Sequence, residues 1–354
     1  MLRSRRFVLV ILASLLITGC LPHSCQRDNE QALFPADSLS REVAQATPTD
    51  TLQALWFAEG TDAHPMERPR TVRFGAGGGV WLTDAQRNRL LVFDATGTLR
   101  RDVDPSGLDV PYLAGVRRDT AIVFNAGRDR FDWIVDGDTA RSVSFERPSA
   151  ETLAYTLATR TALYAKVIGE DTDGVLLRLN DRTGAVDARA SLPGPHWRHA
   201  GFLRAWGDSL LSLSGFRPEV DVLPRSFAPG ASSDTMHLVG FDSPMLSRRY
   251  AFAQGDVTEA PLLSVSAAAA GPYLFVLNLR PGWVQIDAYD RDGQLQRVLV
   301  PAERPMRPSF YPVDIDAQRT GDGYRFAVVR RSPSPRLTVY TWSPSAQGGA
   351  VAQK

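Results

Sequence analysis

The chain has 354 residues, with 40 Lys plus Arg against 39 Asp plus Glu. This near-neutral balance argues against a strongly basic nucleic-acid binder, so no nucleic-acid partner is expected. The hydrophobic content of 44% is too low for a protein built of many membrane-spanning helices. The chain is rich in turn-forming residues, because it contains 28 Gly and 24 Pro.

The N-terminus has the pattern of an export signal. Three arginines and no acid precede an uncharged run from Phe7 to Thr18, FVLVILASLLIT. This run is too short for a membrane-spanning helix, which needs about 20 apolar residues. A basic start followed by a short apolar core is typical of a secretory signal peptide.

The apolar run ends in Leu16-Ile17-Thr18-Gly19-Cys20, which resembles the lipobox of bacterial lipoproteins. The resemblance implies that residues 1–19 are a lipoprotein signal peptide and that Cys20 becomes a lipidated N-terminus in the membrane. An ordinary signal peptide with a chance cysteine is the alternative. A diacyl anchor holds a protein stably, whereas one chain binds only marginally. Leu21 stands where Asp would retain an enteric lipoprotein in the inner membrane, which favours the outer membrane, facing the periplasm.

Residues 20–50 form a polar stretch that we expect to be a flexible, lipidated tether. Once Cys20 is acylated, Cys25 has no partner for an intramolecular disulfide, so the fold is not a disulfide scaffold. Cys25 is either an idle thiol or the site of an intermolecular disulfide. The mature chain has 37 basic and 39 acidic residues, because residues 1–19 contain three Arg and no acid.

From residue 51 onward, short strands alternate with turns. In the clearest unit, Thr71 to Asp104, we expect strands at Val80–Thr83, Leu90–Phe93 and Leu99–Val103. Further units are marked by a polar residue after a strand, at Asp94, Asp136, Asn180, Asp242 and Asp290. These markers are 42, 44, 62 and 48 residues apart, close to the roughly 40–45 residues of a four-stranded propeller blade. The longest interval contains Gly215 to Asp234, which is predicted to be a loop.

The repeat predicts an all-β fold, a six-bladed β-propeller of four-stranded antiparallel blades over residues 51–345, followed by a polar tail at 346–354. The sixth unit ends after its third strand, while Thr51–Phe57 is an unpartnered strand before the first unit. We therefore expect this N-terminal strand to complete the last blade and close the ring. Seven blades or another β fold are the alternatives.

The first unit resembles the NHL repeat of six-bladed propellers. The matching positions are Asp84, Arg89, Leu90, Val92, Phe93, Asp94 and Gly97. Asn88 lies one place later than the usual Asn, and the other units keep the strand pattern but lose most of the motif. Together with the lipobox, this resemblance is to exported bacterial six-bladed propeller lipoproteins, and it implies a shape but not a reaction.

Arginine is frequent in the loops between the second and third strands of the units, which lie on one face of a propeller. Its planar guanidinium suits carboxylate or phosphate, so this face is predicted to bind an anionic ligand or an acidic protein surface. The candidate residues are Arg87, Arg89, Arg128, Arg130, Arg217, Arg280 and Arg330. The alternative is a general use of Arg in place of Lys, since Lys166 and Lys354 are the only lysines.

Motifs for catalysis and metal binding are weak. The chain has neither G-x-S-x-G nor a phosphate-binding G-x-x-x-x-G-K-[ST] motif, so no catalytic residue and no cofactor are assigned. His196 and His199 form H-x-x-H, but neighbouring Gly and Pro indicate a loop, and no metal ligand is assigned.

These observations favour a membrane-tethered binding or scaffold module of the bacterial cell envelope, with an unknown protein or glycan partner, over an enzyme. The alternative is a metal-dependent, lactonase- or lyase-like propeller enzyme. Its ligands would be carboxylates of the central channel, for which Glu170, Asp173 and Asp314 are candidates.

Overall fold

The computed structural model describes residues 38–147, 152–169, 172–280, 282–304, 309–321 and 323–344. The predicted signal peptide, Cys20, Cys25 and the tail at 346–354 lie outside the described residues. Within the described residues, no helix is long and apolar enough to cross a membrane.

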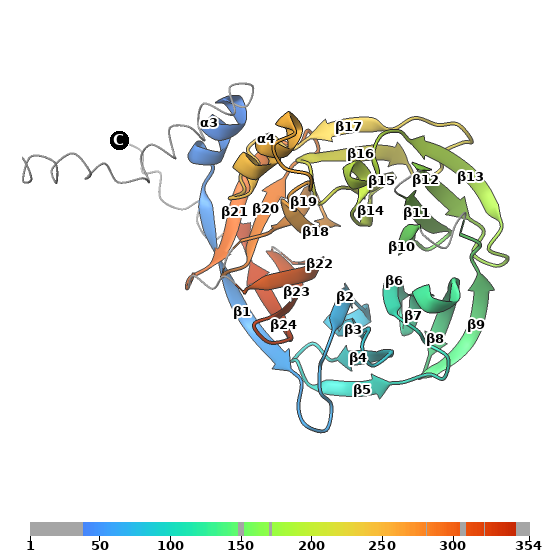
Figure 1. The fold of residues 1–354 in the computed structure, drawn as a ribbon. Coiled ribbons are helices and arrows are strands. Elements are labelled where there is room, and N and C mark those ends of the chain that lie inside the picture. The colour runs from blue at the N-terminus through green and yellow to red at the C-terminus, as the bar shows by residue number, and fades with distance from the viewer. Residues whose placement is uncertain are drawn as a thin grey trace, which may run out of the picture.

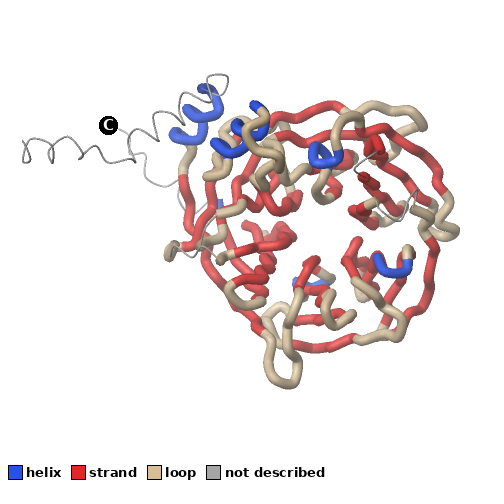
Figure 2. The backbone as a smooth tube through the Cα atoms, in the orientation of Figure 1, coloured by secondary structure: helices blue, strands red, loops and turns tan. Residues whose placement is uncertain are grey.

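β-Sheets surround a central axis in a propeller-like ring (Figure 1). Figure 2 shows how strongly strands outnumber helices. Four sheets have four antiparallel strands each, and we number these units one to four. Unit one holds β2 (Pro69–Phe74), β3 (Val80–Asp84), β4 (Arg89–Phe93) and β5 (Leu99–Val103). Unit two holds β6 (Pro111–Arg117), β7 (Thr120–Asn125), β8 (Arg130–Val135) and β9 (Asp138–Ser144). Unit three holds β10 (Leu153–Ala158), β11 (Leu163–Gly169), β12 (Thr172–Leu179) and β13 (Val186–Leu192). Unit four holds β14 (Leu203–Trp206), β15 (Ser209–Leu213), β16 (Glu219–Pro224) and β17 (Asp234–His237).

The remaining sheet has eight strands and contains two further four-stranded units. Unit five holds β18 (Ser264–Ala270), β19 (Tyr273–Asn278), β20 (Gln285–Tyr289) and β21 (Leu295–Pro301). Unit six holds β22 (Tyr311–Thr320), β23 (Gly323–Ser332), β24 (Arg336–Trp342) and the N-terminal β1 (Thr49–Glu59).

Strand β1 joins these two units. Its second half, Gln53 to Glu59, pairs antiparallel with β24, as the sequence predicts for a closing strand. Its first half, Thr49 to Leu52, pairs in parallel with β21, which the sequence does not predict. The ring therefore consists of four separate four-stranded sheets and one continuous eight-stranded sheet, where the sequence predicts six separate blades.

Burial follows the position of each strand in its unit. All five residues of β3 and all five of β4 are buried, because neighbouring sheets cover both faces of these middle strands. The outer strand β13 instead alternates between exposed and buried side chains. The described buried apolar residues form six hydrophobic clusters, each built from two neighbouring units.

Unit four differs from its prediction. The stretch Gly215 to Asp234, predicted to be a loop, contains the third strand β16, and the fourth strand β17 begins at its end. Prolines next to β16 and at its end explain the difference, since Pro is tolerated at strand ends but is typical of loops in sequence. The extra length of this repeat lies mostly after β17, in a connection with the helix α4 (Leu246–Gln254).

Part of the predicted tether belongs to the folded domain. The helix α3 (Ser38–Ala46) lies against the outside of the ring near β21 and α4 (Figure 1). The Ser40 hydroxyl accepts a hydrogen bond of 2.6 Å from the Gly240 amide, and Val43 packs against the cluster between units four and five. The described domain thus begins at residue 38, where the sequence predicts residue 51. Three short 3-10 helices complete the described elements: η2 (Ala76–Gly78), η3 (Ala126–Arg128) and η4 (His196–His199).

The closing strand offers a matched test of the fold. Leu52 is 3% exposed in the cluster between units five and six, whereas Leu55 on the same strand is 51% exposed. Leu52→Ala should lower the free energy of unfolding by about 2–5 kcal/mol, because it leaves a cavity at the ring closure. Leu55→Ala should change it by no more than about 0.5 kcal/mol. Urea denaturation measures both, and equal losses would contradict the assigned role of β1.

Candidate functional site

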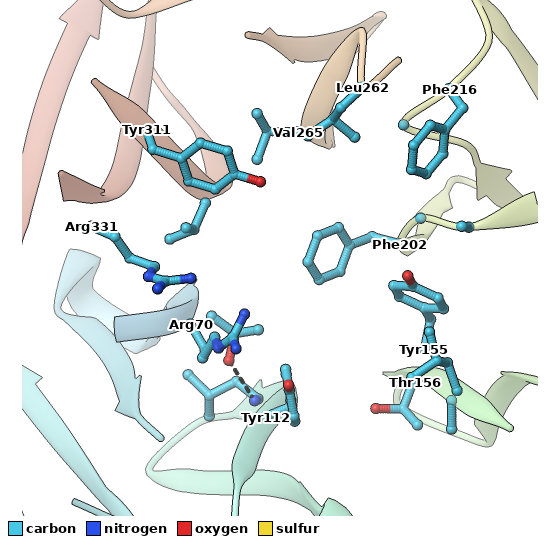
Figure 3. Close-up of a pocket in the computed structure, with 18 of the residues that line it drawn as sticks. Arg70, Tyr112, Tyr155, Thr156, Phe202, Phe216, Leu262, Val265, Tyr311 and Arg331 are labelled. Atoms are coloured by element: carbon cyan, nitrogen blue, oxygen red, sulfur yellow. Dashed lines mark hydrogen bonds between the residues drawn. The ribbon is translucent and has the colours of Figure 1, made fainter. Parts of the chain in front are cut away.

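A funnel of about 450 Å³ lies at the centre of the ring (Figure 3). Its walls come mainly from the beginnings of the innermost strands of the six units, for example β2, β10 and β22. Because adjacent strands in each unit are antiparallel, the beginning of an inner strand lies at the same end as the loop between the second and third strands. The funnel therefore opens on the face that carries the arginine-rich loops predicted from the sequence.

β-Bulges shape the funnel wall. The pairing register shifts at Arg70 in β2, at Val265 in β18, and at Val313 and Arg331 in the β22–β23 pair. All four residues line the funnel. A bulge adds a residue to one strand and re-aims side chains, and bulges are frequent beside functional sites. In a regular strand, successive side chains point to opposite faces of the sheet. The bulges interrupt this alternation at the residues that line the funnel.

Arg70 and Arg331 form the cationic wall of the funnel. Figure 3 shows both side chains pointing into the cavity from the same side. No described residue forms an ion pair or a side-chain hydrogen bond with either guanidinium, and no acidic residue is among the described residues that line the funnel. Arg70 Nε is buried and has no hydrogen-bond partner among the described residues.

The two guanidinium groups affect each other. Burial lowers the pKa of Arg70, and the positive charges of Arg68 and Arg331 lower it further. Arginine nevertheless keeps its proton in proteins, so both positive charges persist. Like charges held together in a half-buried site favour an anion that compensates them.

Aromatic residues form the opposite wall. Tyr155 of β10 and Phe202, just before β14, meet edge to face with ring centroids 5.8 Å apart. Phe216, from the β15–β16 loop, lies on the same side of the cavity (Figure 3). Burial raises the pKa of the Tyr155 hydroxyl to about 12, so this side chain is neutral at physiological pH. The charge of the funnel wall therefore comes from the arginines.

The floor of the funnel is a buried ionic cluster around Asp314. One Asp314 oxygen accepts hydrogen bonds of 2.8 Å from Arg73 and 3.0 Å from the Val72 amide. The other accepts bonds of 2.8 Å from Arg204 and 2.6 Å from Ser266. These partners come from the inner strands of units one, four and five, so the cluster connects four inner strands across the axis.

Lys166 lies behind the aromatic wall and is the only lysine among the described residues. Its side-chain nitrogen donates a 2.7 Å hydrogen bond to the Leu213 carbonyl and lies 5.3 Å from the centroid of the Tyr155 ring. The residue is completely buried, and this burial lowers its pKa well below the usual value. Lys166 does not line the funnel and supports Tyr155 from behind.

The seven arginines predicted from the sequence have varied surroundings. Four are engaged within the protein: Arg89 pairs with Asp102, Arg130 with Asp132, Arg217 with Glu219 and Asp221, and Arg280 with Asp242. Guanidiniums that are already neutralised attract an external anion less strongly. The remaining three are at the surface or partly buried: Arg87 pairs with exposed Glu67, Arg330 lies 3.9 Å from Glu59, and Arg128 is exposed. Binding by this face remains a prediction.

The carboxylates considered for a metal do not assemble a site in the described part of the chain. No group of three or more His, Cys, Asp or Glu side chains among these residues is placed to hold a metal ion. Asp314 is committed to Arg73 and Arg204, while Glu170 and the side chain of Asp173 lie outside the description. His199, from the H-x-x-H motif, has both ring nitrogens near acceptors, Asp221 at 3.2 Å and the Pro193 carbonyl at 2.9 Å.

Sequence reasoning missed most of the funnel. Arg70, Tyr112, Tyr155 and Phe202 line it but do not belong to the predicted arginine set. A signal was available, because these residues lie at or just before the start of the innermost strand in successive repeats. An alignment of the repeats on the start of the innermost strand identifies these residues. An alignment on the loop between the second and third strands does not.

Comparisons with known proteins support the fold. Neither a family profile nor a curated protein sequence matches the chain. The calcium-binding protein regucalcin from Agrobacterium tumefaciens is similar in structure, with a TM-score of 0.54 and 13% identity over 84% of this chain and 96% of that one. Virginiamycin B lyase from Staphylococcus aureus gives 0.48 and 11% identity over 82% and 89%. At 13% identity the likeness to regucalcin concerns the propeller fold alone.

The Asp314 cluster predicts a large effect on stability. Asp314→Ala should lower the free energy of unfolding by about 3–5 kcal/mol, because it removes the carboxylate that is bonded to the two buried guanidiniums of Arg73 and Arg204. Asp208→Ala is the control, since Asp208 is fully exposed. Urea denaturation should show almost no change for the control. A loss at Asp314 no larger than that of the control would contradict the cross-axis role of the cluster.

Proposed function

We propose that this protein is a propeller-type binding protein of the bacterial cell envelope, and that its funnel binds the anionic group of a ligand. The observation that carries the proposal is the pair Arg70 and Arg331, two positive charges in one cavity without a counter-charge among the described residues. Arginine binds phosphate and carboxylate through paired N–H groups, and such charge-assisted hydrogen bonds are stronger than neutral ones.

This proposal keeps the face predicted from the sequence but changes the residues that bind. Arg89, Arg130 and Arg217 form ion pairs within their own units, and Arg280 pairs with Asp242 in the connection after β17. Arg87, Arg128 and Arg330 lie on the loop face around the funnel and would raise the local concentration of an anion or contact an acidic partner. Arg70 and Arg331 bind the ligand directly.

The proposal treats the ring as a six-bladed, NHL-like propeller. Each half of the eight-stranded sheet is an antiparallel four-stranded unit, as in the separate sheets. An apolar cluster that includes Phe275 and Phe326 lies between the two halves. Every other pair of neighbouring units also packs through such a cluster. Strand β1 then links the fifth and sixth blades across the point where the ring closes.

The proposal also places the ring on a membrane. The lipobox ending at Cys20 supports lipidation, and Leu21 supports transfer to the outer membrane with the ring in the periplasm. The described domain begins at Ser38, so 17 residues separate it from Cys20. A protein or glycan of the envelope with an anionic group is then within reach of the funnel.

The anion site is tested by isothermal titration calorimetry with inorganic phosphate on the full chain in detergent. Arg70→Ala and Arg331→Ala should each weaken binding by about 10-fold or more, as expected for the loss of a charge-assisted hydrogen bond. Arg182→Ala is the matched control. Arg182 is exposed in the β12–β13 turn, which lies on the face of the ring opposite to the funnel opening. Phosphate binding that is absent from the wild type, or unaffected by both funnel substitutions, would overturn the proposal.

Lipidation is tested separately by substituting the two cysteines. Cys20→Ser should move the protein from the membrane pellet to the soluble fraction and abolish incorporation of labelled palmitate. Cys25→Ser should change neither result, because the lipobox assigns the acyl chains to Cys20 alone. Membrane association and labelling that persist in Cys20→Ser would show that the anchor is not at this residue.

A further inference from the structure

We infer that the funnel binds an aromatic anion, a flat aromatic body that carries a phosphate or carboxylate group. This inference rests on the proposed anion binding by Arg70 and Arg331, and adds the chemistry of the rest of the ligand. It draws on the arrangement of the two walls, the contacts that hold the aromatic wall and the ionic cluster beside the cavity.

The two walls face each other across the cavity and differ in charge, and Tyr112 and Tyr311 line the cavity beside the arginines. The cationic wall comes from unit one, through Arg70, and from unit six, through Arg331. The aromatic wall comes from units three and four, through Tyr155, Phe202 and Phe216 (Figure 3). A ligand that satisfies both walls needs an anionic group at one end and an apolar surface at the other.

The aromatic wall is held in place by contacts from behind. The Arg204 guanidinium carbon lies 4.9 Å from the centroid of the Phe202 ring, and Arg204 is itself bonded to Asp314. Tyr155 meets the edge of Phe202 and has the Lys166 nitrogen 5.3 Å from its ring centroid. Rings that are already ordered lose little entropy when a ligand stacks on them. Their offset and edge-to-face packing preferences suit another flat ring.

The floor limits the length of the apolar part. The Arg73–Asp314–Arg204 cluster crosses the axis below the funnel, and an apolar chain pushed into it would break buried ion pairs. The cavity of about 450 Å³ lies within the range of small-ligand sites. A compact ring therefore fits the funnel, whereas a long acyl chain could not extend past the ionic cluster toward the other face of the ring.

The inference is tested with probes that have the same anionic group and different bodies: phenyl phosphate, cyclohexyl phosphate and methyl phosphate. Titration calorimetry on the full chain in detergent should show phenyl phosphate binding about 10-fold or more tightly than methyl phosphate, because the phenyl group is removed from water. Cyclohexyl phosphate should bind more weakly than phenyl phosphate, because it cannot stack on the aromatic wall.

Substitutions then assign this preference to the wall. Phe202→Leu should reduce the phenyl-over-methyl ratio by about 3-fold or more while leaving methyl phosphate affinity unchanged, because it removes the ring and keeps the charges. Phe216→Leu provides a second variant if Phe202→Leu unfolds, which thermal denaturation reports. Phe57→Leu is the matched control, since Phe57 is 58% exposed on β1.

The outcomes separate the two proposals. If phenyl and methyl phosphate bind equally and Arg70→Ala weakens both, the anion site stands and the aromatic inference is overturned. If cyclohexyl phosphate binds as tightly as phenyl phosphate, or if neither folded wall variant lowers the ratio, the aromatic inference is likewise overturned. If none of the three probes binds, both proposals fail.

Discussion

The Asp314 carboxylate is the interaction on which the centre of this ring depends. It accepts hydrogen bonds from Arg73, Arg204, Ser266 and the Val72 amide, which belong to three other units. A buried carboxylate is tolerated only when such partners replace water. Because the hydrogen-bond donors of Asp314 come from other units, the cluster connects inner strands that are not paired in any sheet. Arg73 belongs to this cluster and also lines the funnel, so the cluster adjoins the cavity.

The unpaired charges of the funnel contrast with the paired charges elsewhere. Third strands in units two, four and five carry buried Asp132, Asp221 and Asp287, each bonded to side chains of its own unit. Asp132 and Asp221 bind arginines. Asp287 binds the amides of Asn278 and Gln285 and no arginine, and burial raises its pKa to about 7. Arg89, Arg130 and Arg217 thus stabilise individual units, whereas Arg70 and Arg331 have no ion pair among the described residues.

The second and third strands of the units could be predicted closely, because their continuous apolar sequence is a local signal. The sequence predicts a strand at Leu90–Phe93, and β4 is Arg89–Phe93. The two agree because neighbouring sheets bury both faces of this strand, which selects a continuous apolar run. Unit four was less predictable, because Pro218 and Pro224 conceal a strand whose formation depends on its neighbours. The parallel pairing of Thr49–Leu52 with β21 had no sequence signal, because it brings together segments almost 250 residues apart.

By itself, the sequence determined the all-β class and the closing role of the N-terminal strand, and it predicts an export signal and a lipobox. These features depend on residue type and short-range spacing, which a single chain displays directly. Only the tertiary structure decided which arginines are free. An arginine in a loop looks the same in sequence whether a carboxylate of its own unit neutralises it or not. Arg70 and Arg331 come together because bulges in two strands, from opposite ends of the chain, turn both side chains into one cavity.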